Sequence, residues 1–350
     1  MTESWLDSSI RDSELTIPGM HIYRNDRRNG RGGGSAIYVA TTLRTSSVHA
    51  SALCELPESV WLTIHTAPST NCLLGVIYRS PSADTYFDSK LKQCLDTISS
   101  LGYDQTLIMG DFNHPQINFA EGKVNGSKDS PACLFYESVI EAGLFEQVQT
   151  YTRWRDGVQP SRLDYILTSE QYMVERLSVD CPLGRSDHCT ITFQWITQVT
   201  LTIPERRYLR NYNKANYHAI KTHLAHIDWP LDVMQLSLES HWEFIIQQLN
   251  AVVELYVPVY NPRVRTKNPI RSSTKKLIAT KRLAWNKYKQ SPTAESWTNY
   301  VRLRNQTVAC VRQDKREAQQ LFAKSIRRNP KLFFKTLSVH SKSRVGISSI

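Results

Sequence analysis

Short apolar runs alternate with amphipathic segments over the first two hundred residues, and this alternation constrains the fold more than any other feature of the chain. The apolar runs are rich in β-branched and aromatic residues, and they cover positions 36–39, 60–64, 74–78, 106–109, 163–167 and 190–195. Runs of this length and composition are typical of buried strands. Strands interleaved with helices predict a layered α/β or α+β domain.

Two segments between the apolar runs have the pattern of helices. Asp84 is a suitable N-cap, because its carboxylate can accept a hydrogen bond from an early backbone N–H. After it, apolar residues recur at helical spacing at Phe87, Leu91, Leu95 and Ile98. A second helix is predicted over residues 131–141, with Gly143 as its stop signal. The glycine-rich segment 30–34 matches neither a P-loop nor a dinucleotide motif and predicts a hairpin or a mobile loop.

The composition of the chain changes near Pro204. The residues that follow, 205–260, have a helical pattern, and two Asn-Pro pairs then bracket a basic linker. Long helices are predicted from Ser272 onward. We therefore expect an α/β domain, a helical connector with a linker, and a basic helical region, at residues 1–200, 201–270 and 271–350.

Charge is distributed unevenly along the chain. Residues 1–203 hold 16 Lys and Arg against 23 Asp and Glu, a net charge of −7, whereas residues 204–350 hold 27 against 9, a net charge of +18. An acidic front half is suited to collecting a cation, and a strongly basic rear half is suited to a polyanion such as DNA or RNA. A solvated helix surface is the alternative explanation of the basic half.

The cysteines and the apolar runs limit the class of protein. The seven cysteines are irregularly spaced and include no C-x-x-C pair, which argues against a structural zinc site and favours a reducing, intracellular compartment. The N-terminus has no apolar signal core, and no uninterrupted apolar run is long enough for a membrane span.

Four short segments carry side chains that could do chemistry, and two of them lie next to predicted strands. The G-D-F-N segment places Asp111 and Asn113 on the same side of an extended chain, where they could orient a water and hold a phosphate oxygen. The R-S-D-H segment sets Asp187 beside His188, a pair suited to acid–base or metal chemistry. Taken alone, the first segment is usually an ordinary turn and the second is more often an ordinary loop.

The other two segments contain one carboxylate each. The R-L-D-Y-I-L segment puts Asp164 within an otherwise apolar strand pattern, where an unpaired charge is expensive to bury. A histidine is one natural partner, because a carboxylate fixes the tautomer of the ring and stabilises its protonated form. The T-E-S-W-L segment contains Glu3, and on its own it is explained as a capped helix turn at the N-terminus.

Together these segments resemble the endonuclease/exonuclease/phosphatase superfamily, and in particular the endonuclease domain of non-LTR (LINE-type) retrotransposons, which is related to apurinic/apyrimidinic endonucleases. Two further segments support the resemblance: Y-R-S-P, which begins at Tyr78, and Y-T, formed by Tyr151 and Thr152. Six short motifs in the family's order make accident improbable. The resemblance implies a four-layer α/β sandwich, followed here by a basic helical region.

The resemblance also implies a site. Its catalytic residues would be Tyr78, Asp111, Asn113, Asp164, Asp187 and His188. Its substrate contacts would come from Tyr78, Asn113, Thr152 and Ser186. Glu3 and Asp187 would hold the metal, which is expected to be Mg²⁺ with Mn²⁺ as the alternative, because hard cations prefer oxygen ligands.

Each of these residues has an expected role in phosphodiester hydrolysis. Asp111 would position or deprotonate the attacking water. Asn113 and His188 would hold the scissile phosphate and stabilise the charge of the transition state. Asp164 would orient His188, Asp187 would support the metal or the water, and Tyr78 would contact the phosphate.

The rear of the chain resembles the same elements. Residues 281–289 and 297–331 are similar to the region that joins the endonuclease to the reverse transcriptase. No Y-x-D-D type polymerase motif appears before Ile350, and the family normally has a further strand before T-E-S-W-L. We therefore expect an N-terminally truncated chain that lacks the first strand of the endonuclease and the reverse transcriptase.

Three functions are compatible with this reading. The first is a Mg²⁺-dependent DNA endonuclease that nicks a strand for retrotransposition, active or inactivated by truncation. The second is a nucleic-acid-binding retroelement remnant without catalysis, and the third is a phosphatase or phosphodiesterase acting on lipids or inositol phosphates. The expected partners are DNA and, through the basic C-terminal region, element RNA, with no membrane. The function implies a nuclear location, and the oligomeric state stays open.

Overall fold

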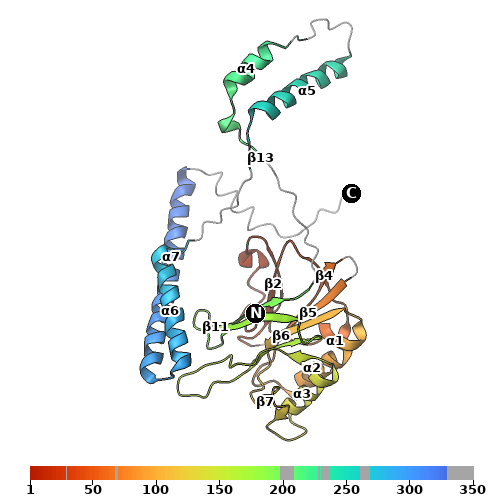
Figure 1. The fold of residues 1–350 in the computed structure, drawn as a ribbon, viewed down its shortest axis with the longest axis vertical. Coiled ribbons are helices and arrows are strands. Elements are labelled where there is room, and N and C mark those ends of the chain that lie inside the picture. The colour runs from red at the N-terminus through yellow and green to blue at the C-terminus, as the bar shows by residue number, and fades with distance from the viewer. Residues whose placement is uncertain are drawn as a thin grey trace. The chain divides into compact units, whose positions relative to one another are not determined.

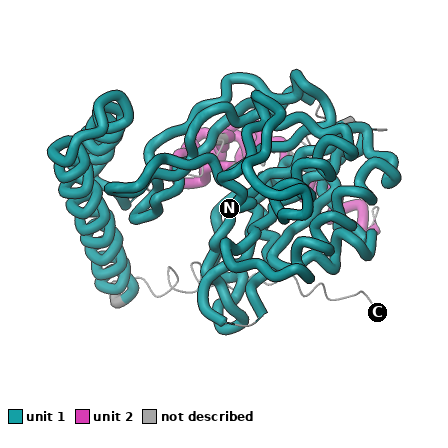
Figure 2. Tube along the Cα trace, turned by 90° about the horizontal axis from the view of Figure 1, so that it is seen from below, with its two compact units in different colours: residues 1–202, 269–350 teal, residues 203–268 magenta. Residues whose placement is uncertain are grey.

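The computed structural model describes residues 1–28, 30–67, 70–197, 209–227, 229, 237–260 and 269–328 (Figure 1). The chain divides into two compact units, one formed by residues 1–202 with 269–350 and the other by residues 203–268 (Figure 2). The predicted change of composition near Pro204, the predicted basic linker at 261–268 and the segment after Arg328 lie outside the described residues.

A mixed sheet of six strands organises the first unit. Its order is β3, β4, β5, β6, β10 and β9, which span Arg44–Ser47, Ser59–Ala67, Thr70–Tyr78, Gln105–Asp111, Asp164–Thr168 and Phe145–Glu146. Within this sheet β5 and β6 run parallel, and the other neighbours are antiparallel. A parallel pair needs a long crossover connection, and helix α2 (Thr85–Ile98) lies within it.

The two predicted helices form where their start and stop signals stand. Asp84 caps α2, since its carboxylate accepts a hydrogen bond from the backbone N–H of Phe87 at 2.9 Å. All four apolar positions of the predicted stripe are buried on this helix. Helix α3 (Pro131–Glu141) is followed by Gly143 in the left-handed conformation, with φ of +67°. Both helix predictions are confirmed.

Alternate residues of the sheet enter two separate cores. Ile77 of β5 lies in a core with Phe112, Tyr165 and the apolar sides of α1, α2 and α3. Val76, the neighbour of Ile77, lies in a second core between the sheet and the hairpins β1–β2 and β11–β12. Because successive side chains of a strand point to opposite faces, a strand buried on both sides has a nearly continuous apolar sequence. The remaining elements of this domain are η1 (Asp12–Leu15), β1 (Met20–Asn25), β2 (Ser35–Ala40), α1 (Ser51–Cys54), η2 (Ser99–Leu101), β7 (Ile117–Asn118), β8 (Lys123–Val124), β11 (Val174–Asp180) and β12 (Thr190–Trp195).

Two long helices, α6 (Ser272–Gln290) and α7 (Ala294–Arg328), form a hairpin in the first unit (Figure 1). Trp285, Tyr288 and Tyr300 are buried between them, and Trp154 of the α/β domain packs against this cluster. The helices predicted from Ser272 onward are therefore confirmed. The α/β class with a helical C-terminal region is also confirmed.

The second unit contains a pair of helices, α4 (Tyr217–Ala225) and α5 (Leu238–Tyr256). Its short strands β13 (Leu209–Arg210) and β14 (Val259–Tyr260) pair with each other, and a 3-10 turn, η3, covers Tyr212–Lys214. The helical pattern predicted for residues 205–260 is confirmed in α4 and α5. Among all the described residues, no helix is both long and apolar enough to cross a bilayer.

Gly110 of the G-D-F-N segment is required by the sheet. It lies opposite Ile77 in the parallel pair, and a Cβ at this position would be 1.9 Å from the carbonyl oxygen of Ile77. We expect Gly110→Ala to lower the free energy of unfolding by about 3 kcal/mol or more, because the backbone of β5 must move. Urea denaturation followed by circular dichroism measures this loss.

Gly126→Ala is the matched control for Gly110→Ala. A Cβ at Gly126 meets only the side chain of Ser130, whose Oγ at 3.0 Å caps α3, so the substitution disturbs at most that one capping bond. The expected loss is below about 1 kcal/mol. Equal losses for the two variants would contradict the close approach of β5 and β6 at Gly110.

His114 is a buried histidine behind the sheet, with its ring stacked on Phe135 at 5.1 Å between centroids. Burial, together with the positive charge of Arg79, lowers the pKa of His114 to about 3. In the unfolded chain His114 has its ordinary pKa near 6.5. Between about pH 3 and pH 6.5 the unfolded chain therefore binds this proton more readily than the folded chain does. Stability present above pH 6.5 is therefore lost as the pH falls toward 3.

We expect the free energy of unfolding to fall by about 2 kcal/mol between pH 6.5 and pH 5 through this one group. His114→Phe should remove that part of the decline, since Nε2 of His114 has no hydrogen-bond partner among the described residues. His49→Phe, at an exposed position, should leave the decline in place. Denaturation curves at several pH values test this, and an unchanged slope in His114→Phe would refute it.

Candidate active site

Three neighbouring strands present polar side chains at the same edge of the sheet. Tyr78 ends β5 and Asp111 ends β6, and the parallel register pairs these two residues directly. Asp164 begins β10, and the antiparallel register pairs it with Asp111. An antiparallel strand starts where its neighbour ends, so residues distant in sequence meet at this edge.

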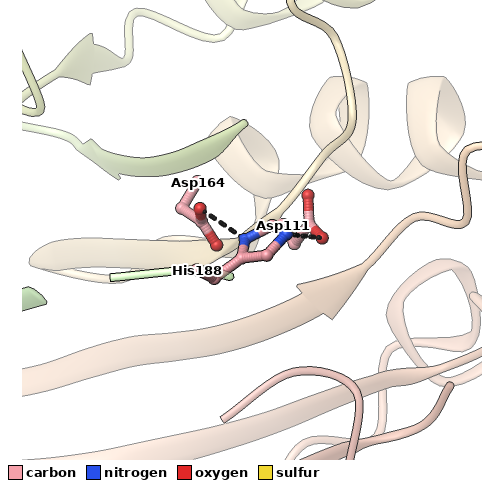
Figure 3. A group of neighbouring side chains, drawn as sticks. All are labelled: Asp111, Asp164 and His188. Atoms are coloured by element: carbon pink, nitrogen blue, oxygen red, sulfur yellow. Dashed lines mark hydrogen bonds and ion pairs between the residues drawn. The ribbon is translucent and has the colours of Figure 1, made fainter. Parts of the chain in front are cut away.

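His188 completes a compact group with the two aspartates (Figure 3). Its Nδ1 lies 2.9 Å from Oδ2 of Asp164, and its Nε2 lies 3.8 Å from Oδ2 of Asp111. One ligand-capable atom from each of the three side chains lies within 4.8 Å of the others. Asp164 thus has a histidine partner, which a carboxylate in an apolar strand needs.

The electrostatics of this group favour a protonated His188 and raise the pKa of Asp111. Burial and the neighbouring charge of Asp164 raise the pKa of Asp111 to about 7. Burial opposes the charge of His188, but the hydrogen bond with Asp164 and the negative charges around the ring outweigh it and raise the pKa of His188 to about 9. At neutral pH the histidine therefore carries a proton.

Glu3 reaches this edge of the sheet from the N-terminal segment. The phenol of Tyr78 is 3% exposed and donates a hydrogen bond to Oε1 of Glu3 at 2.7 Å. Burial and this bond raise the pKa of Tyr78, so the phenol stays protonated and acts as a donor. The charge of Glu3 also acts on Asp111, which adds it to the same electrostatic group.

The glycine-rich segment positions Glu3. It forms the turn between β1 and β2, and the carbonyls of Gly34 and Gly33 accept hydrogen bonds from the backbone N–H groups of Ser4 and Trp5 at 3.2 and 3.0 Å. A Cβ at Gly33 would lie 2.2 Å from Oε2 of Glu58, which itself accepts the backbone N–H of Gly34 at 2.7 Å. Hydrogen bonds therefore join this turn to the N-terminal segment and to Glu58.

Asn113 adopts a left-handed conformation, with φ of +52°, just after β6 ends, so the predicted extended chain from Asp111 to Asn113 is wrong. Its side-chain amide donates to the carbonyl of Arg79 at 2.7 Å, and its backbone N–H donates to Oδ1 of Asp111 at 3.2 Å. The Arg79 guanidinium is itself held by Asp88 through two hydrogen bonds. Asn113 therefore joins the loop after β5 to the carboxylate of Asp111.

Thr152 and Ser186 hold the backbone around the site. Thr152 is fully buried, and its hydroxyl accepts the backbone N–H groups of Leu163 and Asp164 at 3.1 and 3.2 Å. Its carbonyl accepts the backbone N–H of Cys189 at 2.7 Å. Ser186 is exposed, and its hydroxyl accepts the backbone N–H of His188 at 3.0 Å. These bonds tie Asp164 and His188 to one another.

Asp187 is engaged by two arginines that the motif analysis did not single out. Its Oδ2 accepts hydrogen bonds from Nε of Arg153 at 2.8 Å and from Nε of Arg155 at 2.6 Å. Burial would raise the pKa of Asp187, but the two guanidinium groups outweigh it and lower that pKa. Among the described residues, the side chains close enough to share an ion include neither Asp187 nor Glu3.

A third arginine also lies near the site, with the guanidinium carbon of Arg27 5.8 Å from the ring centroid of Tyr78. The signal for Arg153 and Arg155 was the R-W-R sequence directly after Tyr151 and Thr152, where alternate residues of an extended chain share a side. The Arg27 guanidinium is paired with Glu58, at 2.9 Å between Nε and Oε1.

One segment of the chain matches the model of a known protein family. Residues 72–192 match the family described as "endonuclease-reverse transcriptase". No curated protein matches the chain.

Among solved structures, the endonuclease domain of TRAS1, a telomere-specific non-LTR retrotransposon, is 20% identical, with 52% of this chain and 82% of that chain covered and a TM-score of 0.41. The 3′ phosphatase NExo from Neisseria, bound to a product DNA hairpin, is 15% identical, with 56% and 87% covered and a TM-score of 0.42. An endonuclease/exonuclease/phosphatase family protein from Leptotrichia buccalis is 17% identical, with 51% and 70% covered and a TM-score of 0.34.

The matched segment contains five of the residues that meet at the sheet edge: Tyr78, Asp111, Asn113, Asp164 and His188. Glu3 lies outside it. The family model therefore matches the segment that contains most of the candidate site, and this segment is less than half of the chain.

Proposed function

We propose that the chain is a Mg²⁺-dependent DNA endonuclease that hydrolyses one phosphodiester bond and leaves a nick able to prime reverse transcription. The observation that carries this proposal is the group at the sheet edge, in which His188 lies between Asp164 at 2.9 Å and Asp111 at 3.8 Å. A protonated imidazole beside a carboxylate supplies a proton donor for a phosphate and an acceptor for a water.

The donor set suits a hard cation. Asp111 and Asp164 offer carboxylate oxygens close to one another, and Glu3, which Tyr78 holds at the same edge, would have to approach them to complete the set. Burial and the repulsion by Asp164 raise the pKa of Asp111, and a divalent ion would relieve that repulsion. Such an ion would stabilise the developing charge on the phosphate and lower the pKa of a bound water. The protonated His188 would not compete as a ligand.

Asp187 is proposed as an anchor for Arg153 and Arg155, although the family resemblance makes it a metal ligand. Its Oδ2 already accepts two charged hydrogen bonds, which would have to be released before that atom bound a cation. The two guanidinium groups would contact backbone phosphates of the bound DNA.

The residues divide the chemical work among themselves. Asp111, in its ionised form, would take a proton from the attacking water, and His188 would donate a hydrogen bond from Nε2 to a phosphate oxygen. Asp164 would hold Nδ1 of His188 and preserve the charge of the ring. Tyr78 and Asn113 would hold Glu3 and the loop after β5 in place.

The first unit offers a surface suited to DNA. A cavity of about 1220 Å³ is lined by amide and aromatic side chains, including Gln116, Asn118, Gln147, Tyr151 and Trp154. Amide groups pair with base edges, and aromatic rings stack on bases. Element RNA remains a proposed partner of the basic C-terminal region, and action on chromosomal DNA would take place in the nucleus.

A nicking assay tests the catalytic proposal. Purified chain and supercoiled plasmid should give open circles in Mg²⁺ and none after EDTA. Asp164→Asn should lower the rate by about 10³-fold or more, because His188 loses its charge partner. Asp129→Asn, at an exposed loop position, should nick at the normal rate.

The same assay distinguishes the alternative functions. A folded chain that binds DNA in a salt-sensitive way and never nicks it would be a binding remnant. Hydrolysis of small phosphoesters without nicking would favour the phosphatase alternative.

Metal binding can be measured without any cleavage. We expect Mn²⁺, followed by its electron paramagnetic resonance signal, to bind at least about tenfold more weakly to Asp111→Asn and to Glu3→Gln than to the unchanged chain. Glu121→Gln, an exposed control, should bind normally. Normal binding by Asp187→Asn would agree with its anchoring role, whereas a loss matching that of Asp111→Asn would restore Asp187 as a ligand.

A further inference from the structure

The helical hairpin α6–α7 contacts both loops that carry the site. Trp285 of α6 is fully buried, and its ring meets that of Trp154 edge-on at 5.9 Å between centroids. Tyr288 meets the same Trp154 ring at 5.9 Å. Trp154 belongs to the segment between β9 and β10, so this segment is packed directly on the hairpin.

The backbone around Trp154 links this contact to the site. Side chains alternate in an extended chain, and here Trp154 meets the hairpin while Arg153 and Arg155 bond to Asp187. The backbone N–H of Trp154 also donates to the carbonyl of Asp187 at 3.0 Å. Trp285 is therefore connected to the residue before His188 through one intermediate side chain.

The loop that carries His188 touches the hairpin a second time. Nζ of Lys281, a buried lysine, donates to the carbonyl of Pro182 at 3.0 Å. Cys181 and Cys189, which flank this loop, pack against the aromatic cluster of the hairpin. Lys289 donates to the carbonyl of Val179 at 3.0 Å, just before the loop.

Between these contacts the loop forms an exposed turn, which is closed by the backbone N–H of Ser186 donating to the carbonyl of Leu183 at 3.0 Å. Leu183, Gly184, Arg185 and Ser186 are all exposed. The site, in contrast, needs His188 within hydrogen-bond reach of Asp164 and facing Asp111. Small displacements of a catalytic group are costly for the rate, so an external support of the loop has a functional consequence.

We propose that α6–α7 is a clamp on the loop 182–188, in which Trp285 and Lys281 are positioning residues for His188. The clamp makes the basic helical region part of the nuclease, beyond its use as a surface for nucleic acid. The expected effect of the clamp on the nicking rate rests on the proposed function, whereas its expected effect on hydrogen exchange in the loop does not.

Hydrogen exchange measured by mass spectrometry tests the clamp in the full chain. Trp285→Ala should raise the exchange rate of peptides covering 152–154 and 181–190 by about tenfold or more, because the N–H groups of Trp154 and Cys189 lose their support. Leu283→Ala is the matched control, since Leu283 lies on the same helix and is 69% exposed. Trp285→Phe should restore most of the protection.

Lys281→Met keeps the apolar stem and removes only the bond to Pro182, so it tests the loop without disturbing the aromatic cluster. It should speed exchange in 181–190 and leave α7 unchanged. If both variants leave 181–190 as protected as in the unchanged chain, the clamp is overturned.

The nicking assay adds a second readout. Lys281→Met should lower kcat by about tenfold or more with KM for plasmid nearly unchanged, because it alters the loop and not Trp154, which lines the cavity assigned to DNA. If the unchanged chain does not nick DNA, the proposed function fails, and hydrogen exchange still decides the clamp.

Discussion

The antiparallel pairing of β10 with β6 sets two carboxylates, Asp111 and Asp164, opposite each other at a sheet edge, and the rest of the site compensates for that placement. Like charges in a partly buried position repel, and neither can leave the edge without breaking the register. His188 supplies one positive charge, and the backbone N–H of Asn113 supplies a donor to Asp111. The hydroxyl of Thr152 holds the backbone at the start of β10 in place by accepting two backbone N–H groups.

Helices and the chemical needs of single side chains could be predicted from the sequence better than the contacts between distant segments. Capping at Asp84 and the stop at Gly143 depend on neighbouring residues, so α2 and α3 could be predicted locally. The need of Asp164 for a histidine followed from the cost of a charge in an apolar strand. The bonds of Asp187 to Arg153 and Arg155 could not be predicted, because they depend on how two loops approach each other.

Contacts of the helical hairpin with the α/β domain could not be predicted from the sequence either, and they use part of its positive charge. Helical spacing predicted the helix that carries Trp285, but spacing on one helix does not reveal a partner in another part of the fold. Lys281 and Lys289 count toward the basic charge of the rear half, yet both ammonium groups bind backbone carbonyls of the α/β domain. Part of the positive charge therefore serves the fold, and net charge alone overstates the surface left for nucleic acid.

Glu3 is held by backbone bonds from its neighbours Ser4 and Trp5 to the turn between β1 and β2. That turn also carries Arg27 and Arg31, which lie beside the rings of Tyr78 and Trp5. A surface turn is where a nuclease can most easily acquire new sequence preference. An insertion in this turn would also shift the carboxylate of Glu3, so in the proposed endonuclease target choice and catalysis would have to evolve together.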